Sequence, residues 1–150
     1  MSIVEKEKEQ LLELLEKPLE GQGAYIADLV ISKFMHNTTV RFFVYTENGA
    51  TLDECAKISR FIGDKIEELD MYEAGYMLEV SSPGLDRKLT KEIDFKYRVG
   101  EKVKITFSDP SRKATTAEIL SSENGVVKFE NSDGSFETAL AEIENAKIVY

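Results

Sequence analysis

Hydrophobic and polar positions repeat with two different periods in the first 81 residues. Apolar residues spaced three or four apart predict one helix from Ile3 to Lys17, ending at Pro18, and a second from Leu52 to Leu69. Alternation with a period of two predicts strands at residues 24–32, 39–46 and 76–81. The order of these elements predicts an αββαβ domain.

Two short motifs mark where the helices begin. Ser2 and Glu5, and again Thr51 and Glu54, have the spacing of a capping box, in which a hydroxyl and a carboxylate bind free backbone N–H groups. Between the first two predicted strands, a polar loop that contains His36 and Asn37 predicts a hairpin connection.

From about residue 102 the pattern changes to short strands separated by turn signals. Val103, Ile105 and Phe107 alternate with polar residues, and Asn124-Gly125 and Asp133-Gly134 are typical of tight hairpin turns. About 55 residues with no predicted helix suit a five-stranded SH3-like (Sm-like) barrel, which leaves no exposed sheet edge. The fold class is therefore α+β, with an N-terminal αββαβ domain at 1–82, a linker at 83–91 and a small all-β barrel at 92–150.

Charge and length narrow the functional classes. The 150 residues carry 28 acidic and 19 basic side chains, a net charge of −9 that disfavours binding nucleic acid by bulk charge. No apolar run reaches the about 20 residues that a bilayer span needs, and residues 1–10 have no secretory signal. We therefore expect a cytoplasmic protein with no membrane role, acting as a monomer.

Residues suited to catalysis or to metal and cofactor binding are scarce. Cys55 lies on the apolar side of the second predicted helix, which indicates a small core residue, and His36 is expected to be an exposed loop residue. With one Cys and one His the chain has no metal-ligand motif, and it has no phosphate-binding glycine loop. We expect no enzyme, no metal and no cofactor, so no residue is nominated as catalytic.

One motif stands out at the predicted junction of the domains. The run from Tyr76 to Leu89 contains Ser-Pro-Gly-Leu-Asp-Arg directly after a strand. Pro83 restricts the residue before it, and Gly84 is suited to the positive φ of a type II turn. Asp86 and Arg87 then either anchor backbone groups or meet a partner, and the segment is either a structural turn or a binding site.

At this motif the chain resembles the ribosome maturation factor RimP family, whose signature matches the run from Leu78 to Arg87. The resemblance extends to residues 49–60, to Asp94-Phe95 and to Val99-Gly100. It implies an αββαβ domain joined to an SH3-like barrel. It also implies a factor that binds the immature small ribosomal subunit and promotes its assembly without catalysis.

The candidate contact residues follow from the motif and from the basic side chains of the barrel. The interdomain turn, which is also a candidate partner-binding segment, comprises Ser81, Ser82, Pro83, Gly84, Leu85, Asp86 and Arg87. Candidate contacts to rRNA or protein are Lys102, Lys104, Arg112 and Lys113.

Both predicted halves are acidic, with a net charge of −6 up to Lys91 and −3 from Glu92. Basic small-subunit ribosomal proteins are therefore the expected main partners, with rRNA secondary. The alternatives are an RNA-binding adaptor that acts through the Sm-like barrel, and a hydrolase with an unrecognised carboxylate site.

Overall fold

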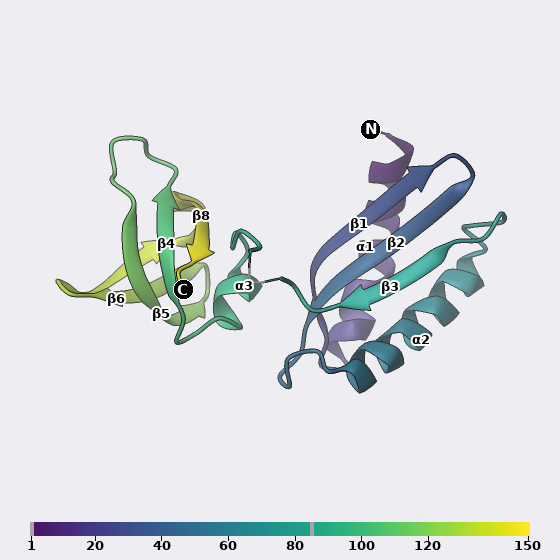
Figure 1. Cartoon of the computed structure of the whole chain (residues 1–150), viewed down its shortest axis with the longest axis horizontal. Coiled ribbons are helices and arrows are strands. Elements are labelled where there is room, and N and C mark those ends of the chain that lie inside the picture. Colours follow the sequence, from purple (N-terminus) through teal and green to yellow (C-terminus); the bar gives the residue numbers. More distant parts are fainter. Residues whose placement is uncertain (1, 85) are drawn as a thin grey trace. The chain divides into compact units, whose positions relative to one another are not determined.

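The computed structural model describes residues 2–84 and 86–150, and it has the α+β composition expected from the sequence. The chain divides into two compact units, one ending at Pro83 and one running from Gly84 to Tyr150. The first unit combines helices and a sheet, and the second is built around an all-β sheet (Figure 1). Leu85 belongs to the signature motif and lies outside the described residues.

The first unit has the predicted αββαβ order. It comprises α1 (Ile3–Glu20), β1 (Tyr25–Phe34), β2 (Asn37–Tyr45), α2 (Leu52–Leu69) and β3 (Met77–Ser81). Its sheet has the order β1-β2-β3, with β1 and β2 antiparallel and β2 and β3 parallel. Because parallel neighbours need a crossover connection, α2 carries the chain from the end of β2 back to the start of β3.

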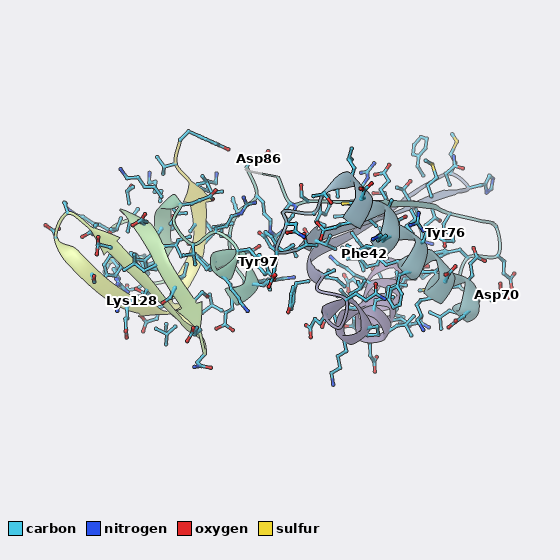
Figure 2. The ribbon with its side chains drawn as sticks, turned by 90° about the horizontal axis from the view of Figure 1, so that it is seen from below. Phe42, Asp70, Tyr76, Asp86, Tyr97 and Lys128 are labelled. Atoms are coloured by element: carbon cyan, nitrogen blue, oxygen red, sulfur yellow. The ribbon has the colours of Figure 1, made fainter. Side chains whose placement is uncertain are left out.

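One apolar core joins the helices and the sheet of this unit. Figure 2 shows Phe42 of β2 beside the helices. The buried residues follow the two predicted periods, and the helices contribute Leu11, Leu15, Leu19, Ile58, Ile62 and Ile66 while the first two strands contribute Leu29, Ile31, Val40, Phe42 and Val44.

Two details differ from the expectation for α1 and the hairpin. The predicted end of α1 before Pro18 is wrong, because the helix continues to Glu20 with Pro18 inside its last turn. There the missing N–H removes a single helical bond, and the extra turn buries Leu19 completely. The hairpin loop is also shorter than predicted, since β1 extends to Phe34 and pairs it with Asn37, leaving only Met35 and His36 in the turn.

The predicted capping box forms in full at α2, and its hydroxyl bond forms at α1. Thr51 Oγ1 accepts a bond from Glu54 N–H at 3.2 Å, and Glu54 Oε1 accepts one from Thr51 N–H at 3.1 Å. These two bonds complete the capping box of α2. At α1, Ser2 Oγ accepts a bond from Glu5 N–H at 3.1 Å.

The second unit contains a five-stranded antiparallel sheet of order β7-β6-β5-β4-β8. Its strands are β4 (Lys102–Phe107), β5 (Thr115–Glu123), β6 (Val126–Asn131), β7 (Gly134–Ala139) and β8 (Ile143–Ile148). The tight turn at Asn124-Gly125 is confirmed, because both residues have positive φ, 53° and 77°, between β5 and β6.

The expectation of no helix in this unit is wrong. A short helix α3 (Glu92–Lys96) precedes the strands, and a 3-10 turn η1 (Leu140–Glu142) precedes β8. Five residues are too few to show a helical period in the sequence. Phe95 of α3 is fully buried in the core of the second unit together with Phe129 of β6, and their rings meet edge to face at 6.2 Å.

Candidate functional site

The part of the signature that was predicted as the interdomain turn, Ser81 to Arg87, begins at the last residue of β3 and is called the signature segment below. Ser81 and Ser82 are exposed, Pro83 is buried and Gly84 is exposed again. Among the described residues of the segment, the exposed side chains are therefore polar and small, and Asp86 is the only exposed charged one. The described residues of the segment therefore offer hydrogen-bonding groups to a partner and no exposed apolar side chain.

The prediction of a type II turn with a positive φ at Gly84 is wrong, because Gly84 is not among the glycines with positive φ. Arg87 N–H instead donates to Gly84 C=O at 3.2 Å, so Gly84 is the first residue of a turn and not a central one. The first position of a turn requires no left-handed backbone. A Cβ at Gly84 would lie 2.8 Å from Asp86 Oδ1, the end of a flexible side chain.

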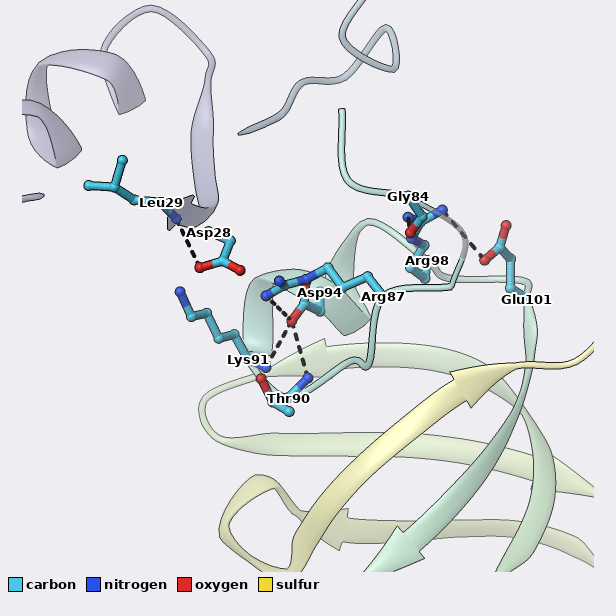
Figure 3. A network of polar contacts seen from close by, with 9 residues as sticks. All are labelled: Asp28, Leu29, Gly84, Arg87, Thr90, Lys91, Asp94, Arg98 and Glu101. Carbon is cyan, nitrogen blue, oxygen red and sulfur yellow. Dashed lines mark hydrogen bonds and ion pairs between the residues drawn. The ribbon is translucent and has the colours of Figure 1, made fainter. Parts of the chain in front are cut away.

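Arg87 is bound by a fully buried carboxylate. Its Nε and Nη2 donate to Asp94 Oδ1 and Oδ2 at 3.0 and 3.2 Å, a bidentate arrangement (Figure 3). The Asp94 side chain has no exposed surface, and that of Arg87 is 17% exposed. Two-point pairing of this kind fixes the orientation of the guanidinium as well as its position.

Asp94 also organises the backbone around α3. Its Oδ2 accepts bonds from the N–H groups of Thr90 and Lys91, both at 3.1 Å, which lie at the start of the helix. The carboxylate therefore binds the signature arginine and two backbone donors at once, and this compensates the cost of burying its charge. Nearby, Arg98 Nη2 reaches Gly84 C=O at 3.5 Å and Nη1 lies 3.9 Å from Glu101 Oε2.

Residues 87–91 are thereby part of the second unit. Leu89 is fully buried in its core and exchanges two backbone hydrogen bonds with Ala146 of β8, at 2.8 and 3.0 Å. Sequence reasoning did not identify Asp94 and Arg98 as the partners of this segment. The sequence marked Asp94 only as part of the Asp94-Phe95 pair in the family resemblance. That pair gives no information about which residues Asp94 binds.

The four basic residues nominated in the barrel do not form one patch. Lys102 lies opposite Glu118 in the sheet and shares a hollow with Glu118 and Glu130. Arg112 stacks on the Phe107 ring, 3.7 Å from its centre, and lies 3.5 Å from Glu142. Lys113 lines a second hollow, which it shares with Arg112 and Glu137. Lys104 differs from these three, because its cross-strand partner on β8 is another lysine, Lys147.

The comparison with known families gives a direct result for the first unit. Residues 14–86 match the RimP N-terminal domain. The chain belongs to the RimP family. The matched range begins within α1, spans the sheet and α2, and ends inside the signature motif. RimP proteins are non-catalytic ribosome maturation factors.

The two candidate reactive residues of this RimP-family chain have unremarkable surroundings. Cys55 is half-buried and donates to Ala50 C=O at 3.5 Å, and burial, reinforced by the Glu54 charge, raises the pKa of its thiol. A raised pKa keeps the thiol protonated, so it is a poor nucleophile at neutral pH. His36 is exposed at the β1–β2 turn, as predicted.

Within residues 2–84 and 86–150, no group of three or more His, Cys, Asp or Glu side chains is arranged to hold a metal ion. No helix in the same ranges is long and apolar enough to cross a bilayer.

Exposed apolar side chains at the β1–β2 turn were not anticipated. Phe34 is 72% exposed and Met35 is 85% exposed, and Met77, which pairs with Thr39 on β2, is 64% exposed. The sequence shows no period that separates these residues from the buried ones beside them. They give this end of the RimP N-terminal domain an apolar character that the exposed, described residues of the signature segment do not have.

Proposed function

We propose that this RimP-family protein binds the immature small ribosomal subunit and promotes its assembly without catalysis. The observation that carries the proposal is the match of residues 14–86 to the RimP N-terminal domain. A factor that binds an immature arrangement more tightly than the mature one stabilises productive intermediates and leaves when that preference disappears.

The second unit, in this proposal, is an SH3-like (Sm-like) barrel that acts as a second domain. Support comes from the sheet order, in which β8 returns to pair with β4 after a 3-10 turn, the arrangement typical of SH3-like barrels. Its inward-facing residues form a single apolar core. We take residues 1–82 and 92–150 as the two domains and 83–91 as the segment that connects them, whose last residues, 87–91, pack into the core of the second domain through Leu89.

Basic small-subunit ribosomal proteins are the proposed main partners, and rRNA is secondary. The net charge of −9 supports this, because an acidic surface attracts basic proteins and repels phosphates. The exposed Ser81, Ser82, Gly84 and Asp86 are candidate partner contacts, whereas the Arg87 guanidinium is already bound by Asp94. The protein is proposed to act in the cytoplasm as a monomer.

Sedimentation tests the proposal. Tagged protein from growing cells is expected to sediment with precursors of the small subunit and to be absent from complete ribosomes. Cells that lack the protein are expected to accumulate those precursors. A tagged protein that stays at the top of the gradient, together with normal subunit profiles in the deletion strain, would contradict the proposal.

A second candidate function, an RNA-binding adaptor acting through the barrel, is favoured by one observation, the facing lysines Lys104 and Lys147. The two functions are separated by binding at matched salt to isolated basic ribosomal proteins, to protein-free small-subunit rRNA and to an assembly precursor. Tight binding to naked rRNA without affinity for any ribosomal protein supports the adaptor. The reverse result supports the assembly factor.

A further inference from the structure

Three lysines from three separate segments lie in a row across the second unit. Lys104 on β4 and Lys147 on β8 are direct cross-strand partners, so their side chains share a face of the sheet. On the other side of β8, Leu89 forms an antiparallel bridge with Ala146, which brings Lys88 opposite Lys147. Two interstrand spacings of about 4.8 Å give the row a length of roughly 10 Å.

The row is not neutralised. Lys88, Lys104 and Lys147 are all exposed, and none of them forms an ion pair with any residue in the described ranges. Like charges directly opposite each other in a sheet destabilise it. In a chain with nine more acidic than basic residues, this concentration of positive charge is a local exception.

The three lysines line one hollow of about 290 Å³ together with Thr106 and Asn145, which also face each other across β4 and β8. No acidic and no apolar side chain lines it. Its chemistry is therefore that of an anion site, with three ammonium groups flanked by a hydroxyl and an amide. The lack of an aromatic side chain excludes base stacking within the hollow.

We propose that this lysine row binds consecutive phosphates of an RNA strand. An acidic peptide would bury apolar groups beside its carboxylates, and this hollow offers nothing apolar to receive them. A strand of regularly spaced phosphates matches a linear row of cations without apolar contacts. The choice of RNA as the polyanion rests on the proposed function, since a subunit precursor exposes rRNA.

The test measures binding of the full-length protein to a short, fluorescein-labelled single-stranded RNA of mixed sequence by fluorescence anisotropy over a range of salt. The test variant carries Lys104→Gln and Lys147→Gln. The control variant carries Lys33→Gln and Lys128→Gln, two exposed lysines of which the first pairs with Glu7 at 2.9 Å and the second lies opposite Glu137. Both variants change the net charge by the same amount, and circular dichroism verifies that both are folded.

Three phosphate contacts predict a slope of log affinity against log salt of about −2, and the loss of two contacts reduces it to about −0.7. Wild-type affinity then falls roughly 15-fold between 50 and 200 mM salt, and that of the test variant roughly threefold. The control variant is expected to keep the wild-type slope. Equal slopes for wild type and the test variant, or an equal change in the control, would overturn the proposal.

Two competitors identify the anion. Inorganic phosphate or a polyglutamate peptide that displaces the RNA at concentrations equal in total charge would overturn the assignment to RNA and favour a small-anion or an acidic-protein site. Displacement by unlabelled RNA, without displacement by phosphate or polyglutamate, supports the assignment to RNA. If RNA binding fails while the protein still sediments with subunit precursors, this inference falls and the proposed function stands.

Discussion

Arg87 and the lysine row lie in neighbouring parts of the second unit, but their charges have opposite electrostatic surroundings. Arg87 is bound at two points by the fully buried Asp94. The lysines of the row are exposed and face one another. A cation held by a buried carboxylate contributes to the fold, whereas cations that face like charges cost stability until an anion binds them. The family signature therefore contains a structural arginine, and the unpaired charge lies beside it.

The largest expected effect comes from removing the buried carboxylate. Asp94→Ala leaves Arg87 and the N–H groups of Thr90 and Lys91 without their acceptor and should lower the free energy of unfolding of the second unit by about 3–5 kcal/mol. Urea unfolding followed by the NMR signals of this unit measures the loss. A decrease below about 1 kcal/mol, within the range of ordinary surface changes, would mean that Asp94 does not anchor the segment.

Arg87→Lys should have a smaller effect of the same sign. Lysine keeps the charge but cannot make the two parallel bonds to Asp94, so we expect a loss of about 1.5–3 kcal/mol. The same unfolding experiment applies, with Lys88→Arg as the control at the adjacent exposed position. If Arg87→Lys is neutral for stability but abolishes binding to subunit precursors, Arg87 acts in recognition and the contrast with the lysines disappears.

Removing a lysine of the row should change the free energy of unfolding in the opposite direction. Lys147→Gln removes the central like charge and is expected to raise the free energy of unfolding by at most about 1 kcal/mol, because facing like charges repel. The gain should disappear at high salt, where exposed charges are screened. Lys128→Gln, which removes a lysine opposite Glu137, is the matched control and should give no gain. A stability loss in Lys147→Gln would contradict the picture of an unbalanced row.

Gly84→Ala should have the smallest effect. Its backbone does not have positive φ, and the Asp86 carboxylate near the new Cβ is free to rotate, so we expect a change within about 0.5 kcal/mol. Gly125→Ala is the comparison, since Gly125 has φ +77° with open space around it and should lose about 1 kcal/mol or more from backbone strain alone. If the two variants lose equal stability, the signature glycine is conformationally constrained after all.

Most of the fold was predictable because local patterns specify it. The capping box at Thr51 and the period of Ile58, Ile62 and Ile66 placed α2, and the alternation of Val40, Phe42 and Val44 placed β2. Pro18 shows the limit of such signals. Its helix-breaking tendency was outweighed by the burial of Leu19, a contact between α1 and the rest of the first core that no local pattern contains.

The candidate sites depended more strongly on long-range contacts. Lys102 and Lys104 look equivalent in the sequence, since both occupy the polar positions of one strand. Only strand pairing places Glu118 opposite the first and Lys147 opposite the second. Sequence reasoning therefore grouped Lys104 with Lys102, Arg112 and Lys113. It did not identify Lys88 and Lys147, which are the neighbours of Lys104 in the structure.

By itself, the amino-acid sequence determined the order of the main elements, the periodic apolar positions of both cores and the resemblance to the RimP family, because periodicity, capping and a contiguous motif are local properties of the chain. The tertiary structure alone decided that Asp94 binds Arg87, that Gly84 begins a turn without positive φ, and that Lys88, Lys104 and Lys147 meet. The physical reason is that charge balance depends on which segments become neighbours, and strand register sets those neighbours across up to 58 residues of intervening sequence, between Lys88 and Lys147.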